Sequence, residues 1–128
     1  ALRTALLAVL RAEIGTLEKV PALVFANACE SGVTAEWGGG YTYDGRVYGL
    51  ASAFLQAGVS NYIGTFWRVH DDASAHFAVT FYNEVLYGGT LGQSMQSARE
   101  AVIQRMGWNE LSWAGYMLYG DPTYCLVE

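Results

Sequence analysis

The chain has few basic residues, and this shortage excludes several classes of partner. Its 128 residues include 7 Lys and Arg against 12 Asp and Glu, a formal net charge of −5. Nucleic-acid phosphates bind basic surfaces, so we expect no direct contact with nucleic acid. No apolar run approaches the roughly 18 residues of a membrane-spanning helix without a charge or a glycine, and we expect no membrane partner. Residues 1–20 carry charges among their apolar positions, which is not the pattern of a signal peptide and favours a cytoplasmic protein.

Cysteine is also scarce. The two cysteines, Cys29 and Cys125, lie far apart, and neither has a Cys or His partner at the spacing of a metal site. We therefore expect no metal and no cofactor, and thiols that stay reduced. What the chain does have is a hydrophobic fraction of 52%, which is enough to bury a core and excludes disorder. The length suits a single domain.

Apolar runs and helical spacings alternate along the first half of the chain. Residues 2–15 have the periodicity of an amphipathic helix, and residues 22–26 form an apolar run typical of a strand buried on both faces. A helix is predicted over 46–57 and a second buried strand over 59–67. The glycine-rich stretch 33–45 is interpreted as a mobile loop, which either orders on activation or is a tolerated surface insertion.

Two consecutive helices are predicted in the second half. Asp71 and Asp72 suit the first turn of a helix, because carboxylates there meet unpaired N–H groups, and the pair Gly88-Gly89 ends it. Thr90 and Gln93 form the pattern of a capping box, which begins the next helix. The inner faces are predicted to contain Ala73, Phe77, Phe81 and Val85 in the first helix and Leu91, Met95, Ala98, Val102 and Met106 in the second.

The last part of the chain predicts an edge strand. Residues 112–119 are apolar and aromatic, residues 120–122 are a turn signal, and residues 124–127 are predicted as a short edge strand. This order of helices and strands is α/β. Parallel strands need neighbours on both sides, and this sheet is very small. We therefore expect the chain to contribute only part of a mostly parallel sheet flanked by helices.

Cys29 is the candidate for chemistry, because it follows the end of the first predicted strand. In open α/β sheets, ligands bind beyond the C-terminal ends of strands, where a thiol can meet a substrate. The alternative is that Cys29 is a small buried hydrophobic residue, the usual fate of a free cysteine. Cys125 is expected to be structural.

Three segments resemble one family in their order and spacing. They read ALVFANACESG over 22–32, GLASAFLQAGVSNYIGTFWRVHDD over 49–72, and SWAGYMLYGDP over 112–122. Together they resemble the CHAT domain, a caspase-like cysteine peptidase family that is often attached to tetratricopeptide repeats. The resemblance spans about 22–124 and implies that residues 1–128 are the nucleophile-bearing, C-terminal part of a caspase-like domain.

The resemblance implies a Cys–His dyad with Cys29 as the nucleophile and its backbone N–H in the oxyanion hole. The family's histidine precedes the nucleophile strand, whereas His70 and His76 follow it and match no dyad position. One interpretation is a cysteine endopeptidase whose remaining domain part supplies the histidine. The alternatives are a catalytically inactive caspase-like interaction module and an unrelated α/β domain with a buried Cys29. The family also implies a tetratricopeptide-repeat or sensor protein as regulatory partner.

The same resemblance indicates residues that bind a protein or peptide substrate. Asn27 matches a position that lines the pocket for the residue preceding the cleaved bond. Thr65, Phe66, Trp67 and Arg68 end the strand that pairs with the substrate main chain, a form of strand addition. Trp67 is a pocket wall or a core aromatic residue. Arg68 either binds a substrate carboxylate or is a solvated charge at the rim.

Acidic residues outnumber basic ones around this predicted pocket. Residues 30–72 contain more carboxylates than the two arginines, Arg46 and Arg68, can balance. An acidic site attracts a basic or neutral peptide. Asp71 is therefore also a candidate substrate-binding residue, although its place at the start of a helix is the simpler explanation.

Overall fold

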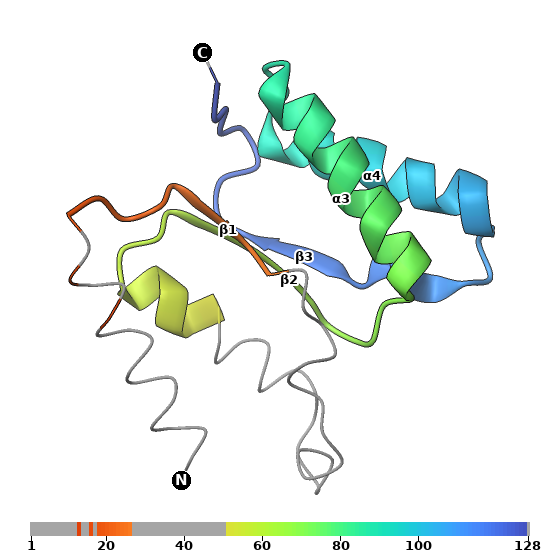
Figure 1. Cartoon of the computed structure of the whole chain (residues 1–128), viewed down its shortest axis with the longest axis horizontal. Helices are drawn as coiled ribbons and strands as arrows, with labels where there is room; N and C mark the ends of the chain where they lie inside the picture. Colours follow the sequence, from red (N-terminus) through yellow and green to blue (C-terminus); the bar gives the residue numbers. More distant parts are fainter. Residues whose placement is uncertain (1–12, 14–15, 17, 27–50, 128) are drawn as a thin grey trace, which may run out of the picture.

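The structure is a computed structural model that describes residues 13, 16, 18–26 and 51–127. The predicted loop over 33–45 and almost all of the predicted helix over 2–15 lie outside these residues, as do Asn27 and Cys29. The described residues form an α/β fold, as predicted (Figure 1). Their sheet is mixed, with one parallel and one antiparallel pair of strands, where a mostly parallel sheet was expected.

The sheet has three strands in the order β1-β2-β3, with β2 in the centre. β1 (Leu23–Phe25) and β2 (Asn61–Thr65) are parallel, and Val24 pairs with Tyr62. Both strands were predicted, and both are shorter than the apolar runs that predicted them. The predicted burial is wrong for β1, whose three residues are only half-buried because β1 is an end strand of the described sheet. Every residue of β2 is buried, because it has a strand on each side and helices on both faces.

The third strand is not where the sequence placed it. β3 is Tyr116–Tyr119 and runs antiparallel to β2, whereas residues 124–127 form no strand and contribute only an isolated bridge between Cys125 and Thr90. The prediction put the strand on the wrong side of the turn at 120–122. The aromatic stretch before the turn can return directly alongside β2, and Pro122 after it has no N–H for a ladder.

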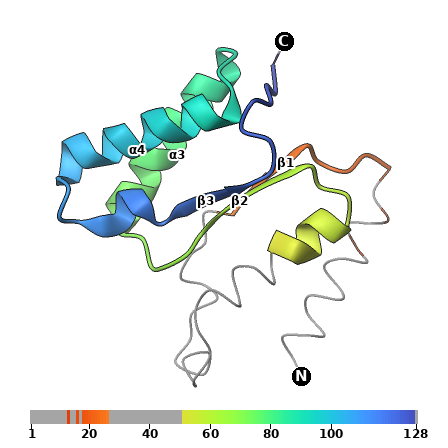
Figure 2. The ribbon, with the colours of Figure 1, turned by 180° about the vertical axis from the view of Figure 1, so that it is seen from behind.

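Helices of the described residues lie on both faces of the sheet (Figures 1 and 2). α3 (Asp71–Leu86) and α4 (Leu91–Met106) pack together on one face, and the helical residues 51–56 lie on the other. Alternate residues of β2 serve the two layers, since Ile63 belongs to the core beneath α3 and α4 while Tyr62 stacks on Phe54. Residues 51–56 confirm the described part of the helix predicted over 46–57.

The predicted inner faces of α3 and α4 are confirmed. Phe77 stacks on Tyr116 of β3 with 3.6 Å between ring centroids, and Phe81 lies 5.2 Å from Phe25 of β1. Aromatic rings therefore join α3 to both edge strands. All the predicted inner residues are buried except the half-buried Met106: Ala73, Phe77, Phe81, Val85, Leu91, Met95, Ala98 and Val102.

The capping box of α4 is confirmed, because the Thr90 hydroxyl accepts from the Gln93 N–H at 3.1 Å and the Gln93 side chain accepts from the Thr90 N–H at 3.2 Å. α3 ends one residue before Tyr87, and Gly88 follows with φ 91°, a value that favours glycine. Within the ranges that the structure describes, no helix combines the length and the apolar character needed to cross a membrane.

Candidate active-site edge of the sheet

The parallel pair β1 and β2 places two strand ends at one edge of the sheet. The hydrogen bonding between the two strands continues one residue beyond β1, where the Ala26 N–H donates to the Ile63 carbonyl at 2.8 Å. The chain after Ala26 therefore leaves the sheet from the edge at which β2 continues into residues 66–68. Asn27 and Cys29 follow in the sequence and lie outside the described residues.

The end of β2 is held by β3 and the segment before it. Thr65 is buried and pairs with Tyr116, and the Phe66 N–H donates to the Gly115 carbonyl at 2.7 Å. That hydrogen bond occupies the N–H of Phe66. The N–H of Phe66 is therefore not available to a peptide strand added at this edge.

Trp67 is neither fully buried nor free to rotate. It is 41% exposed, and its indole N–H donates to the Leu111 carbonyl at 3.2 Å. A Cβ at Gly115 would lie 3.1 Å from the indole nitrogen, so this glycine allows the ring to pack closely. The indole is thus held by a hydrogen bond while part of its surface stays exposed. Arg68 and Asp71 are exposed next to it along the chain.

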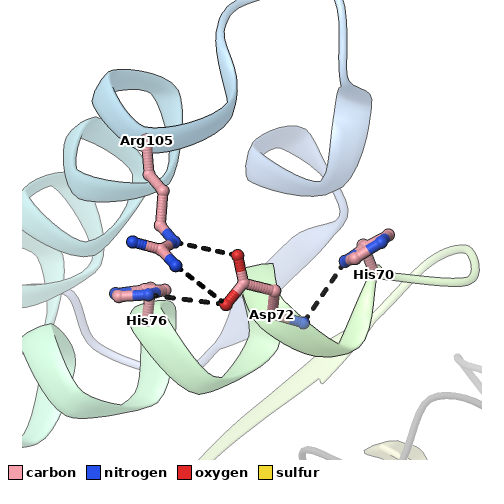
Figure 3. Close-up of polar contacts among 4 residues, drawn as sticks. All are labelled: His70, Asp72, His76 and Arg105. Atoms are coloured by element: carbon pink, nitrogen blue, oxygen red, sulfur yellow. Dashed lines mark hydrogen bonds and ion pairs between the residues drawn. The ribbon is translucent and has the colours of Figure 1, made fainter.

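Four polar residues that the sequence did not group come together at the start of α3 (Figure 3). Arg105 of α4 donates two hydrogen bonds to the Asp72 carboxylate, from Nε to Oδ2 at 2.8 Å and from Nη2 to Oδ1 at 3.4 Å. The Oδ1 atom of Asp72 also lies 3.6 Å from Nε2 of His76. His70 is the N-cap residue, and its Nδ1 accepts from the Asp72 N–H at 3.3 Å.

Asp71 and Asp72 lie in the first turn of α3, as predicted, but the Asp72 carboxylate is not the cap of that helix. The acceptor for the first turn of α3 is the His70 imidazole, and the Asp72 carboxylate is used instead to join α3 to α4. The hydrogen bond from Arg105 lowers the pKa of Asp72, and the same bond raises the pKa of Arg105. A carboxylate held in its ionised form is a poor general base near neutral pH, so we assign Asp72 a structural role.

The segment that precedes β3 is hydrogen-bonded to the start of α3. Ser112, in the short helix η2 (Leu111–Ala114), is buried, and its hydroxyl accepts from the His70 N–H at 2.9 Å. The carboxylate of Glu110 caps η2 by accepting from the Ser112 N–H at 3.1 Å. The N-terminus of α3 is thereby attached to a residue of the SWAGY stretch that the sequence singled out.

Arg99 of α4 is hydrogen-bonded to residues 113 and 116 of the same SWAGY stretch. Its two Nη atoms donate to the carbonyls of Trp113 at 2.9 Å and Tyr116 at 2.7 Å. Burial lowers the pKa of the Arg99 guanidinium. One planar side chain thus satisfies two carbonyls at the junction of η2 and β3.

The YGDP turn, residues 119–122, is hydrogen-bonded to the start of β2. The Asp121 N–H donates to Oδ1 of the buried Asn61 at 2.8 Å, and the Asn61 amide donates to the Ala22 carbonyl at 3.0 Å. A Cβ at Gly120 would collide with Asn61, so this turn requires glycine. Hydrogen bonds from Thr123 lower the pKa of Asp121. The second and third sequence motifs therefore meet at Asn61.

The structure brings together some of the predicted site residues. Thr65, Phe66, Trp67, Arg68 and Asp71 lie in sequence order along the end of β2 and the start of α3. Their relation to Asn27 and Cys29 lies outside the described residues. In the part of the chain that the structure describes, no three His, Cys, Asp or Glu side chains are placed to hold a metal ion.

The family model for the CHAT domain matches residues 3–121, almost the whole chain. This chain belongs to the CHAT domain family, which is a caspase-like, peptidase-related family. The mixed α/β sheet is consistent with part of a caspase-like fold. Searches of curated proteins and of solved structures gave no match.

Proposed function

We propose that this chain is the nucleophile-bearing part of a caspase-like cysteine endopeptidase that cleaves a protein partner in a regulated pathway. The observation that carries the proposal is the shared edge of β1 and β2. Ala26 lies at the end of the sheet where Trp67 and Arg68 follow β2, and Cys29 comes three residues after Ala26 in the sequence. Membership of the CHAT family supports the same assignment.

Cys29 attacks the substrate carbonyl carbon as a thiolate, forming a C–S bond. An imidazole takes up the thiol proton and later delivers it to the leaving amine as the C–N bond breaks. Water then hydrolyses the thioester and regenerates the thiol. The negative charge on the tetrahedral oxygen needs preorganised N–H donors, of which the backbone N–H of Cys29 is one.

The histidine of the dyad is neither His70 nor His76 in this proposal. The Nδ1 atom of His70 accepts the capping hydrogen bond of α3, and His76 lies beside Asp72 on the next turn. Both imidazoles are thus engaged at the start of α3. The dyad histidine is instead supplied by the remaining part of the domain, on a strand that lies next to β1.

The substrate is an extended peptide that binds along Trp67 and Arg68. Trp67 provides the fixed, half-open indole face, and its neighbour Arg68 provides an exposed positive charge. Asn27 and Asp71 complete the proposed contacts, and Thr65 and Phe66 hold the backbone of this segment in place. A repeat or sensor protein regulates access to the site.

The test uses the protein produced from its own gene, incubated with a proteome-derived peptide library. New N-termini are identified by mass spectrometry for the natural enzyme and for Cys29→Ala. We expect cleavage to fall roughly a thousandfold or more in the variant, as when a catalytic nucleophile is removed. The matched control is Cys125→Ala, because Cys125 is exposed and lies at the bridge to Thr90, away from the β1–β2 edge. Cleavage that persists in Cys29→Ala would contradict the proposal.

A catalytically inactive caspase-like interaction module is the second candidate. The observation that favours it is the engagement of both histidines of the chain at the start of α3. The two candidates differ in thiol reactivity. A dyad cysteine reacts with iodoacetamide at a pH well below the ordinary thiol pKa of about 8.5, whereas a module predicts an ordinary or sealed thiol at Cys29.

A further inference from the structure

His70 holds the start of α3 through both its backbone and its side chain. Its backbone N–H donates to the Ser112 hydroxyl of η2 at 2.9 Å, and Nδ1 of its imidazole accepts from the Asp72 N–H at 3.3 Å. His70 is exposed, so protons from water reach the ring. A neutral imidazole has one nitrogen that accepts and one that donates, whereas a protonated imidazole has two donors. The side-chain half of this attachment therefore exists only while His70 is neutral.

The cap of α3 differs in this respect from the other N-caps that the structure describes, those of α4 and η2. α4 is capped by the Thr90 hydroxyl and η2 by the Glu110 carboxylate, each at 3.1 Å. A hydroxyl does not titrate, and a carboxylate loses its charge only in acid. Histidine is the side chain that titrates between about pH 5 and 8. Of these described caps, that of α3 is thus the one that a change of pH near neutrality removes.

The charged side chains around His70 act on this proton in opposite directions. They are Arg68, Asp71, Asp72 and His76 in the same segment of the chain, Arg105 of α4, and Glu110 of η2. The basic residues and the positive end of the α3 dipole oppose protonation of the imidazole, whereas the acidic residues favour it. A proton therefore binds His70 while α3 stays folded.

We infer that His70 is a pH-sensitive cap, whose protonation releases the Asp72 N–H and loosens the first turn of α3. Nδ1 takes up one proton from water, its hydrogen bond to the Asp72 N–H breaks, and no covalent bond to another atom changes. The cap is complete above the pH range in which the imidazole titrates and absent below it. The hydrogen bond from the His70 N–H to Ser112 involves no group that titrates near neutral pH, and it remains.

His76 responds to acid in the opposite sense. Its Nε2 lies 3.6 Å from Oδ1 of Asp72, the oxygen to which Arg105 donates its longer hydrogen bond of 3.4 Å (Figure 3). Protonation adds a positive charge to the His76–Asp72 contact and so strengthens it. As the pH falls, Asp72 thus loses the acceptor of its N–H and gains attraction at its carboxylate. Removing one histidine at a time separates the two effects.

The loosened turn adjoins the candidate active-site edge. Arg68 and Asp71, two of the proposed substrate contacts, lie on either side of His70 in the chain. The Trp67 indole is held by the Leu111 carbonyl, which does not titrate, so the response is confined to the side that includes His70 and Asp71. This response is a property of the fold and does not depend on the proposed peptidase activity.

Hydrogen exchange in the protein produced from its own gene tests the inference. Exchange is followed by mass spectrometry at about pH 5.5 and 7.5, corrected for the intrinsic rate at each pH, in residues 70–77 and in residues 90–97 at the start of α4. We expect protection in 70–77 to fall by about two- to thirtyfold at the lower pH, the loss expected when an N-cap side chain is removed. Protection in 90–97 should stay the same, because the Thr90 hydroxyl does not titrate. An equal fall in both segments, or no fall in 70–77, would overturn the inference.

Two matched variants assign the response. His70→Asn keeps an acceptor at the N-cap that does not titrate, so protection in 70–77 should no longer depend on pH. His76→Gln should keep the fall in protection or enlarge it, because the compensating attraction at Asp72 is lost. A response that persists in His70→Asn, or one that disappears in His76→Gln, would assign the proton to another group and contradict the proposal.

A second measurement leaves His70 in place. In His76→Gln labelled with nitrogen-15, the resonances of the His70 Nδ1 and of the Asp72 amide are followed by NMR from about pH 8 to pH 5. The neutral imidazole should carry its hydrogen on Nε2, since Nδ1 accepts, and both resonances should move with the same midpoint. A hydrogen on Nδ1 of the neutral ring, or two different midpoints, would exclude His70 as the pH-sensitive cap.

Discussion

α3 and α4 have the same length and pack on the same face of the sheet, yet they differ in their N-terminal caps and in the side chains that they expose. α4 begins with a capping box, exposes polar side chains, and is attached to η2 and β3 through Arg99. α3 begins with an imidazole cap, buries an aromatic stripe, and exposes a second apolar stripe.

The difference shows where the described part of the chain exposes polar side chains and where it exposes apolar ones. The contacts of α4 are satisfied by the residues around it, so its outer face needs only to be polar. α3 lies between the core and the open edge of β1, and its N-terminus forms part of the candidate active-site edge. The helix that follows residues 66–68 in the chain is also the one that exposes a stripe of apolar side chains in the described structure.

The largest expected effect is a difference in stability between substitutions on the buried and on the exposed face of α3. Phe81→Ala should lower the free energy of unfolding by about 3–5 kcal/mol, because a fully buried ring that packs on Phe25 is lost. Val79→Ala on the exposed face of the same helix is the control and should stay within about 0.5 kcal/mol. Urea denaturation measures both. Equal losses would remove the distinction between the inner and outer faces.

Arg99 tests how α4 is attached. Arg99→Met should lower the free energy of unfolding by about 1–3 kcal/mol, because it removes the hydrogen bonds that the guanidinium donates to the Trp113 and Tyr116 carbonyls. Arg105→Met, on the exposed side of the same helix, should cost less. Chemical denaturation of the two variants checks the order. A larger loss in Arg105→Met would show that α4 depends on α3 more than on β3.

The caps test how each helix begins. Thr90→Ala removes the hydroxyl of the capping box and should cost about 0.5–2 kcal/mol, while Thr90→Ser should retain most of the stability. His70→Asn replaces the imidazole acceptor of α3 by a better N-cap residue and should not destabilise the chain. Thermal unfolding distinguishes these outcomes. A marked loss in His70→Asn would indicate that the imidazole has a role beyond capping.

The smallest effect concerns the Asp72–Arg105 pair that joins the two helices. Arg105 lowers the pKa of Asp72 in the folded state, so the stabilisation is present above the unfolded pKa of about 3.9 and is lost as the pH falls through the folded value. The difference in unfolding free energy between the natural chain and Asp72→Asn should therefore shrink toward zero in acid, and also in high salt. Urea titrations across this acidic range measure it. A difference that persists below the folded pKa would exclude the ion pair as its source.

The sequence was most informative where a local pattern decides the structure. The capping box at Thr90 and the buried stripe through Phe77 and Phe81 were readable because caps and helical periodicity depend on neighbouring residues. The family was also recognisable, since three motifs recur in order. The roles of Cys29 and Asn27 stay predictions.

The sequence was least informative where distant residues meet. The third strand was placed after the turn at 120–122, because nothing local shows that Tyr116–Tyr119 returns beside β2. The Asp72–Arg105 pair was missed for the same reason. A signal for the cap was present, since His70 directly precedes the acidic first turn of α3.

By itself the sequence determined β2 as a buried strand, the extent and the buried faces of α3 and α4, and the position of Cys29 shortly after β1 in the chain. These features depend on side chains a few residues apart, so composition and spacing contain them. The antiparallel direction of β3, the joining of α3 to α4 by Asp72 and Arg105, and the exposure of Val79, Tyr82 and Leu86 were decided only by the tertiary structure. Each depends on which distant residues pack together, and in the described structure nothing covers the outer face of α3 as α3 itself covers the sheet.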